Sequence, residues 1–364
     1  MAPPLPSYWQ ATEDWHTASE PFRIVKDLPP GHLATNLTVS QQRLAILQTP
    51  SHLLDLLRQT LCHEPRGHAD MYGCFITPPD DAGAHFGALF WHKDGFSTAC
   101  GHGTIALGYW AVTNGVVERI PAEEEEEEEE EEEVVDVVID VPSGRVVARV
   151  TVDGAGRVLH VDFVNVASRL ISAGHELRVR FGPDEISLMV DIAFGGAVYA
   201  FVDTAALGVR VEPSNHHTFV DLGRRIKAEF EGFLYQDKYD LYGVCFFENI
   251  AQTPGAITQR NVVVFADGQV DRSPCGSGTC ARLAVLLARG EVSVERHLVH
   301  ESISGTQFEA FVMETIEPGG EEEEGSDERF PACIPRVRGR ANLVGRMEFF
   351  IDPSDPVYPG FVLR

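Results

Sequence analysis

The sequence has few basic residues for its size. Lys and Arg total 29 against 55 Asp and Glu, which gives a formal net charge of −26 in 364 residues. Two glutamate runs, Glu123–Glu133 and Glu321–Glu324, supply fifteen of the negative charges and leave −11 for the rest. Nucleic acids and anionic membranes are polyanions that bind through clustered Lys and Arg. The sequence therefore argues against both as partners and favours a small-molecule ligand.

Long apolar runs and regularly spaced cysteines are also lacking. No stretch approaches the roughly 18 apolar residues that a membrane-spanning helix needs, and residues 1–9 show no basic segment followed by an apolar run, as a secretory leader would. The seven cysteines are irregularly spaced in a long chain, which is not typical of a disulfide scaffold. We expect a cytoplasmic protein with reduced thiols.

Two of the cysteines lie in a repeated motif, C-G-x-G-T-x-A. It occurs as Cys100–Ala106 and again, 175 positions downstream, as Cys275–Ala281. Each copy precedes an apolar stretch with helical spacing, so each Cys is predicted to stand at a helix start. There the unpaired N–H groups of the first turn and the helix dipole favour a thiolate or a bound carboxylate.

A pair of thiols suits the transfer of a proton from one face of a carbon to the other. One thiolate accepts the proton while the second group, still a thiol, donates its own. An amino acid's α-hydrogen is a poor acid, so backbone N–H groups at Gly101, His102, Gly276 and Ser277 would have to stabilise the charge that develops on the carboxylate. This chemistry requires no metal or cofactor.

Two further side chains are candidates, each with a purely structural alternative. Asp271, four residues before Cys275, is a candidate partner for the substrate's ammonium group, or it caps a turn. His102 either lines the pocket or serves as a structural hydrogen-bonding residue. The other cysteines are expected in the core, as small apolar residues: Cys62, Cys74, Cys245, Cys280 and Cys333.

The order of predicted elements suggests an α/β protein made of two similar halves, with the active site in the cleft between them. Residues 1–15 are predicted as an irregular lead-in. Gly290 is predicted to end the second Cys helix. The remaining predictions are strands at 20–25, 72–76, 88–91, 134–141 and 262–265, two strands within 145–162, an apolar run at 186–202 broken by Gly195 and Gly196, helices within 41–62 separated at Pro50, and an amphipathic helix at 217–233.

These motifs resemble the proline racemase family. The resemblance extends over most of the chain, through the segments 16–21, 64–73, 100–106, 195–196, 271–279 and 355–361. It implies a fold like that of diaminopimelate epimerase, in which each half is a curved mixed sheet around a central helix and the C-terminal strand returns to the first half. It also implies a cofactor-independent enzyme that acts on free proline or hydroxyproline, and we expect a homodimer.

By this resemblance, Cys100 and Cys275 match the acid/base positions of the family. Gly101, His102, Gly276 and Ser277 match the loops that bind the substrate carboxylate, and Asp271 matches the residue that contacts the ring nitrogen. The implied domains are 16–165 with 345–364, and 166–344. The glutamate-rich segments 123–133 and 319–327 are expected to be disordered surface insertions.

The resemblance leaves the reaction open between two members of the family. A thiol at the second position, Cys275, favours racemisation or 2-epimerisation by two bases. Dehydratases of trans-3-hydroxy-L-proline usually hold Thr at that position, yet segments 66–73 and 95–100 look like the dehydratase branch.

Other readings of the cysteine motif fit less well. A C-x5-R phosphatase needs Arg where this chain has Ala281. A zinc site needs paired ligands, but the second motif copy has Ser277 where the first has His102. A cysteine hydrolase leaves the second motif unexplained, and a non-catalytic amino-acid-binding protein has no need of both thiols.

Overall fold

The computed structural model describes residues 6–34, 36–118, 132–233, 239–318 and 330–363. The chain divides into two compact units, residues 1–161 with 340–364, and residues 162–339. The boundaries inferred from the sequence, after residues 165 and 344, lie four and five residues away from these. The first unit is therefore built from both ends of the chain.

The first unit is a mixed sheet that contacts a central helix, α3 (Gly101–Thr113), through β1, β2, β6, β7 and β18. Its strands follow one another in the order β18, β1, β2, β3, β4, β6, β7, with β2–β3 and β4–β6 parallel and the other pairs antiparallel. Helices α1 (Val39–Gln48) and α2 (Leu53–Cys62) contact β4. The strands are β1 (Tyr8–Thr17), β2 (Glu20–Val25), β3 (Gly73–Thr77), β4 (Phe86–His92), β5 (Gly95–Phe96), which pairs with β4, β6 (Glu133–Val141), β7 (Gly144–Val152) and β18 (Ala341–Ile351).

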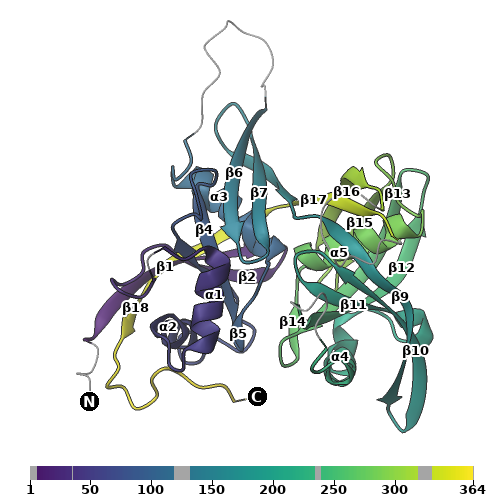
Figure 1. Ribbon diagram of the computed structural model, residues 1–364, viewed down its shortest axis with the longest axis horizontal. Helices are drawn as coiled ribbons and strands as arrows, with labels where there is room; N and C mark the ends of the chain where they lie inside the picture. The colour runs from purple at the N-terminus through teal and green to yellow at the C-terminus, as the bar shows by residue number, and fades with distance from the viewer. Residues whose placement is uncertain (1–5, 35, 119–131, 234–238, 319–329, 364) are drawn as a thin grey trace, which may run out of the picture. The chain divides into compact units, whose positions relative to one another are not determined.

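The second unit is a ring of strands around a central helix, α5 (Gly276–Ala288), visible inside it in Figure 1. Strands β9 to β13 follow in order, β15, β16 and β17 continue the sheet, and β17 pairs back with β9 to close it. The β11–β12 and β13–β15 pairs are parallel. The strands are β9 (Ser168–Phe181), β10 (Asp184–Phe194), β11 (Val198–Asp203), β12 (Leu241–Gln252), β13 (Ala256–Phe265), β14 (Gln269–Asp271), which pairs with β13, β15 (His297–Ser302), β16 (Gln307–Ile316) and β17 (Ala332–Gly339).

The remaining elements connect or cover these sheets. Strand β8 (Val158–Val164) spans the boundary at residue 161 and pairs with β17. The short helices η1 (Thr204–Leu207) and η2 (Pro213–Asn215) lead into α4 (His216–Glu229), which packs against β9, β12 and β13.

The two units repeat the same order of elements. In each, an antiparallel strand pair is followed by helical segments and then by a strand parallel to the second member of that pair. An antiparallel strand, a short hairpin strand, the Cys helix and a final antiparallel pair complete both halves. The prediction of two similar α/β halves, each a mixed sheet around a helix, is confirmed.

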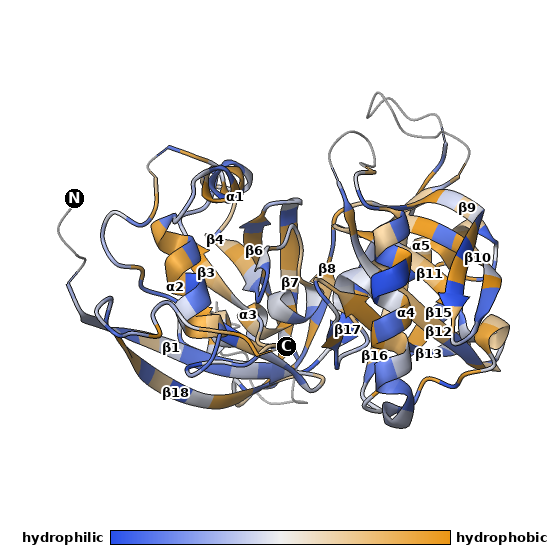
Figure 2. Ribbon diagram, turned by 90° about the horizontal axis from the view of Figure 1, so that it is seen from below, coloured by the Kyte–Doolittle hydropathy of each residue, from blue (hydrophilic) through white to orange (hydrophobic). Residues whose placement is uncertain are grey.

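The two central helices are buried on all sides and are mainly apolar. Every residue of α3 from Gly101 to Val112, and of α5 from Gly276 to Leu286, is buried. A helix that is hydrophobic all round is one that lies in a core. In contrast α4 is amphipathic, and Figure 2 shows it mainly blue beside the orange strands of its unit. Its buried residues Phe219, Leu222 and Ile226 join the apolar core of the second unit.

Two predictions about the first unit are wrong. The lead-in is not irregular to residue 15, because β1 begins at Tyr8 and pairs with both β2 and β18. Its inward side chains include Gln10, Thr12 and Asp14, so the alternation buries polar residues and gives no hydrophobic signal. Asp14 is paired with Arg23, from which it accepts hydrogen bonds of 2.8 and 2.7 Å.

Glu133, the last residue of the predicted acidic insertion 123–133, lies in a strand. Glu133 is the first residue of β6, where it pairs with Val152 of β7, so the strand begins one residue before the expected Val134. An exposed strand end tolerates a glutamate because its side chain can reach water. Residues 123–131 and 319–327 lie outside the described residues.

Candidate active site

Cys100 caps the central helix of the first unit. Its backbone is extended, with φ −155° and ψ 98°, and its Sγ accepts a hydrogen bond of 3.3 Å from the Gly103 N–H. A Cβ at position 103 would lie 2.8 Å from this sulfur and 2.5 Å from the Phe22 ring. The third residue of the helix is therefore glycine because the thiol and an aromatic ring occupy the space of a side chain.

His102 lies beside the Cys100 thiol. Its Nδ1 and Nε2 are 3.4 and 3.7 Å from the sulfur, and its ring meets the Tyr72 ring edge-on with the centroids 5.0 Å apart. Burial lowers the pKa of His102 to about 3. The imidazole is thus neutral near pH 7, and a neutral imidazole has one N–H to donate. In these contacts His102 acts as a hydrogen-bonding neighbour of the thiol.

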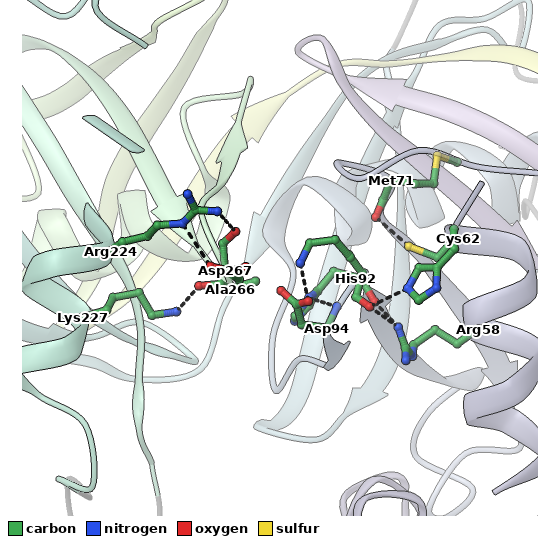
Figure 3. A network of polar contacts seen from close by, with 11 residues as sticks. Arg58, Cys62, Met71, His92, Asp94, Arg224, Lys227, Ala266 and Asp267 are labelled. Atoms are coloured by element: carbon green, nitrogen blue, oxygen red, sulfur yellow. Dashed lines mark hydrogen bonds and ion pairs between the residues drawn. The ribbon is translucent and has the colours of Figure 1, made fainter. Parts of the chain in front are cut away.

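The turn that leads to Cys100 is held by helix α2. Arg58 donates hydrogen bonds of 2.8 and 2.5 Å to the carbonyl oxygens of His92 and Lys93, at the β4–β5 hairpin (Figure 3). Nearby, the Cys62 thiol donates to the Met71 carbonyl at 3.4 Å. Burial raises the pKa of Cys62 to about 12, consistent with its expected place in the core.

The second cysteine stands at the corresponding place of the second unit. Cys275 is the N-cap of α5, but its backbone has φ 63° and ψ 100°. A positive φ is strained for a residue with a Cβ and costs of order 1–3 kcal/mol. The surrounding turn stabilises this conformation, since the Pro274 carbonyl accepts hydrogen bonds of 2.8 Å from Asn261 and 3.0 Å from Thr279.

The turn before Cys275 is ordered by a chain of three residues. Asp271, the last residue of β14, accepts hydrogen bonds of 2.9 and 2.7 Å from the Ser273 N–H and hydroxyl. The Ser273 oxygen in turn accepts from the Cys275 N–H at 3.1 Å. Asp271 therefore does stabilise a turn, the structural role considered for it.

Helix α4 holds the preceding hairpin, as α2 does in the first unit. Arg224 forms an ion pair of 3.0 Å with Asp267, and Lys227 donates to the Ala266 carbonyl at 2.8 Å, both on the β13–β14 turn (Figure 3). Since the turn is followed within a few residues by Asp271 and Cys275, these contacts help to place the second thiol.

Burial dominates the acid–base properties of this second cluster. It raises the pKa of Asp271 to about 6, against the opposing hydrogen bonds from Ser273. Burial also raises the pKa of Cys275 well above its ordinary value, and the neighbouring Asp271 carboxylate adds to the rise. Hydrogen bonds from Tyr199 and Gly278 act in the opposite direction. Taken together, these surroundings favour the protonated form of Cys275.

Tyr199 is the main site residue that the sequence did not reveal. It is fully buried on β11, and its hydroxyl lies 2.7 Å from the Ser277 Oγ and 3.6 Å from the Cys275 Sγ. Its signal in the sequence is weak, because the run 186–202 also contains the polar residues Ser187 and Asp191. Asn261 and Ser273 were missed too, because their partners are set by the tertiary fold or by a turn.

The structure thus assembles the predicted residues into two clusters, one in each unit. Cys100, Gly101 and His102 form the first, and Asp271, Cys275, Gly276 and Ser277 the second. Helix geometry leaves the N–H groups of Gly101 and His102, and of Gly276 and Ser277, without an intrahelical acceptor. Each cluster can therefore offer a thiol together with backbone donors for an anion.

The described part of the chain contains neither a group of metal-ligand side chains nor a membrane-spanning helix. Within residues 6–363, omitting the undescribed gaps, no three His, Cys, Asp or Glu residues are grouped so as to hold a metal ion. Among the same residues, none of the helices has the length and apolar character to cross a bilayer.

Comparison with known proteins identifies the family. Residues 13–362 match the family described as proline racemase. The chain belongs to the proline racemase family. It is 36% identical over 358 residues to a trans-3-hydroxy-L-proline dehydratase of Bacillus cereus, covering 97% of both chains. It is 34% identical over 361 residues to a proline racemase of Acetoanaerobium sticklandii, covering 96% of this chain and 97% of that one.

Solved structures agree with this family. A hydroxyproline epimerase from Agrobacterium vitis, with bound trans-4-hydroxy-L-proline, aligns with a TM-score of 0.82 at 25% identity over 98% of this chain and 96% of that one. A Bacillus anthracis protein of the PhzF family, at 12% identity and TM-score 0.54, covering 94% of this chain and 100% of that one, shares the fold. The predicted family is confirmed, and the chain is an enzyme of this family, an isomerase or a lyase.

Proposed function

We propose that this enzyme racemises or 2-epimerises free proline or hydroxyproline with two thiol groups, one of which removes the α-proton while the other supplies a proton to the opposite face. Cys100 and Cys275 are its acid/base groups. The observation that carries the proposal is that each thiol caps a buried central helix at the same position of two units with the same topology. The names of the proline racemase and hydroxyproline epimerase relatives support the substrate class.

The contacts of the two thiols suit opposite protonation states. The Cys100 sulfur accepts a hydrogen bond from the Gly103 N–H, and such a donor favours a thiolate, with the neutral His102 ring beside it. At Cys275, burial and the Asp271 carboxylate favour the thiol. In this assignment Cys100 removes the proton from one face and Cys275 supplies one to the other. In the reverse direction the roles exchange.

The substrate's charged groups have partners in the same clusters. First-turn N–H groups of Gly101, His102, Gly276 and Ser277 stabilise the carboxylate as negative charge grows on it. Asp271 accepts from the ring ammonium. Burial raises the pKa of Asp271 to about 6. A bound ammonium group lowers that pKa again and so favours the ionised carboxylate. Every step uses this chain's own residues, so the mechanism requires no cofactor.

Dehydration of trans-3-hydroxy-L-proline is a second candidate. The B. cereus relative with that name is 36% identical to this chain, against 34% for the racemase of A. sticklandii. Elimination needs one base at the α-carbon and an acid for the departing hydroxyl group. Cys100 and the protonated Cys275 could supply both.

Proton exchange at the α-carbon distinguishes the candidates. The enzyme is incubated in deuterated water with L-proline, trans-4-hydroxy-L-proline or trans-3-hydroxy-L-proline, and the α-hydrogen is followed by NMR. The proposal predicts deuterium incorporation with inversion for one of the first two substrates. Loss of the 3-hydroxyl to give a cyclic imine, without inversion of any substrate, would instead establish the dehydratase.

Single thiol variants test the two-base mechanism. Cys100→Ser and Cys275→Ser should each abolish inversion, because a serine hydroxyl is too weak an acid to replace a thiol. Cys62→Ala, which removes a buried thiol hydrogen-bonded to Met71, is the matched control and should retain activity. Inversion that survives in Cys275→Ser would contradict the proposal. Dehydration that survives there while inversion is lost would favour the second candidate.

A further inference from the structure

The Tyr199 hydroxyl stands between an acid/base thiol and a carboxylate-binding residue. It is within hydrogen-bonding distance of both, 3.6 Å from the Cys275 Sγ and 2.7 Å from the Ser277 Oγ. The tyrosine is fully buried, and its ring meets the Tyr242 ring edge-on at 5.5 Å. Packing therefore fixes the phenol ring, so the Tyr199 oxygen stays within hydrogen-bonding distance of both Cys275 and Ser277.

One phenol hydrogen cannot serve both partners at once. When Cys275 is a thiol, its S–H can donate to the Asp271 carboxylate or to the Tyr199 oxygen. The Tyr199 O–H can then donate to Ser277, which leaves the Ser277 hydrogen for a substrate. When Cys275 is a thiolate, the Tyr199 O–H turns to the sulfur and the Ser277 hydroxyl donates to Tyr199. Only hydroxyl groups rotate, and both Tyr199 and Ser277 keep their protons.

We propose that Tyr199 is a positioning residue that couples the protonation of Cys275 to the hydrogen bonding of Ser277. The inference rests on the proposed acid/base role of Cys275. While Cys275 holds its proton, the Ser277 hydroxyl can donate a hydrogen bond to a bound carboxylate. Once Cys275 has lost its proton, the Ser277 hydroxyl donates to Tyr199 instead. In the direction in which Cys275 supplies the proton, this change weakens the binding of the product carboxylate, and in the reverse direction it strengthens it.

The surroundings leave the phenol as the neutral donor of the cluster. Asp271 on β14 and Cys245 on β12 raise the pKa of Cys275, and Tyr242 on β12 faces Tyr199. Burial, followed by the Cys275 charge, raises the pKa of Tyr199 well above its ordinary value. Tyr199 therefore keeps its proton through the working range and can stabilise the Cys275 thiolate only by hydrogen bonding.

Tyr199→Phe tests the proposal because it removes the hydroxyl and keeps the ring. The measurement is the pH dependence of iodoacetamide alkylation at Cys100 and at Cys275, read separately by peptide mass spectrometry. Losing one donor to a thiolate should raise the Cys275 pKa by about one unit. At a pH below the Cys275 pKa, alkylation of Cys275 should then slow about threefold. The variant has about tenfold less thiolate, but a thiolate of higher pKa is more nucleophilic, which offsets part of the loss. Cys100 should be unaffected.

Thiol-specific measurement is needed because turnover alone cannot locate the effect. L- and D-proline have equal free energies, so kcat/KM is the same in both directions for every variant. The pH profile of α-deuterium exchange is still informative, since its alkaline limb should move upward with the Cys275 pKa. Where the wild-type Cys275 is not alkylated, the chemical shift of its ¹³C-labelled β-carbon gives the same titration.

Controls separate this role from a structural one. Tyr109→Phe removes another buried phenol hydroxyl, which donates to the Leu159 carbonyl at 3.2 Å, and should leave both thiols unchanged. Ser277→Ala removes the competing acceptor of the phenol hydrogen and should shift the Cys275 pKa downward, and this test remains if Tyr199→Phe folds poorly. An unchanged Cys275 titration in both site variants would overturn the proposal. Inactivity of the wild type on all three amino acids would refute the proposed function but leave the titration test valid.

Discussion

The glycine at the third position of each Cys helix allows a graded prediction. A Cβ at Gly103 would lie 2.5 and 2.7 Å from Phe22 ring atoms and 2.8 Å from the Cys100 sulfur. A Cβ at Gly278 would meet the Cys275 sulfur at 3.0 Å, its Cβ at 3.3 Å and the Tyr199 ring at 3.5 Å. Alanine should therefore be tolerated better at Gly278 than at Gly103.

Two opposing energies decide the size of each effect. Alanine in place of glycine stabilises a helix interior by up to about 1 kcal/mol, whereas overpacking a core costs about 1–3 kcal/mol. At Gly103 the three short contacts should leave Gly103→Ala about 1–2 kcal/mol less stable than the wild type. At Gly278 the two terms nearly cancel, so Gly278→Ala should unfold within about 1 kcal/mol of the wild type.

Activity should fall in both variants, because ordinary contact begins near 3.4 Å and each sulfur must therefore move by several tenths of an ångström. A displacement of 1 Å can cost about a hundredfold in rate, so roughly a tenfold loss is expected. Urea unfolding and the initial rate of α-deuterium exchange measure the two effects. Gly154→Ala, where a Cβ meets nothing within 4 Å, is the control. Full activity in Gly278→Ala, or wild-type stability in Gly103→Ala, would refute this reasoning.

Two further predictions concern stability. Asp14→Ala leaves the buried Arg23 guanidinium without its carboxylate and should lower the free energy of unfolding in urea by about 3–5 kcal/mol. Asp136→Ala, at the exposed pair with Arg149, should lower it by under about 1 kcal/mol. Equal losses would show that burial does not decide the cost. Burial lowers the pKa of His300 from 6.5 to about 3, so the unfolded chain binds its proton first and stability falls as the pH drops below 6.5, by up to about 1.4 kcal/mol per unit. His300→Asn should therefore lose less stability than the wild type between pH 7 and pH 5.5, and parallel losses would contradict the assignment.

Local features of the site could be predicted because they depend on neighbouring residues. The repeated C-G-x-G-T-x-A motif placed both cysteines at helix starts, and the structure has each one as an N-cap. Gly290 ends the second Cys helix in the left-handed conformation, with φ +69°. Such features follow from helix capping and from the absence of a side chain, so they can be recognised in a short segment.

Features that depend on distant partners could not be predicted. Strand β1 has polar side chains on its buried face, and it is a strand because β2 and β18 provide its hydrogen bonds. Closure of the second unit needs β17 to reach β9, more than 150 residues earlier. No local periodicity encodes either pairing.

The sequence by itself determined which chemical groups stand at the starts of the two central helices: two thiols, each followed by glycines and backbone donors. Only the tertiary structure decided how those groups are tuned. Tyr199 reaches Ser277 across 78 positions because β11 borders α5, and Asp271 and Cys275 have raised pKa values because the closed sheet excludes water from them. Burial and strand register are properties of the whole fold, so no segment of the chain reveals them.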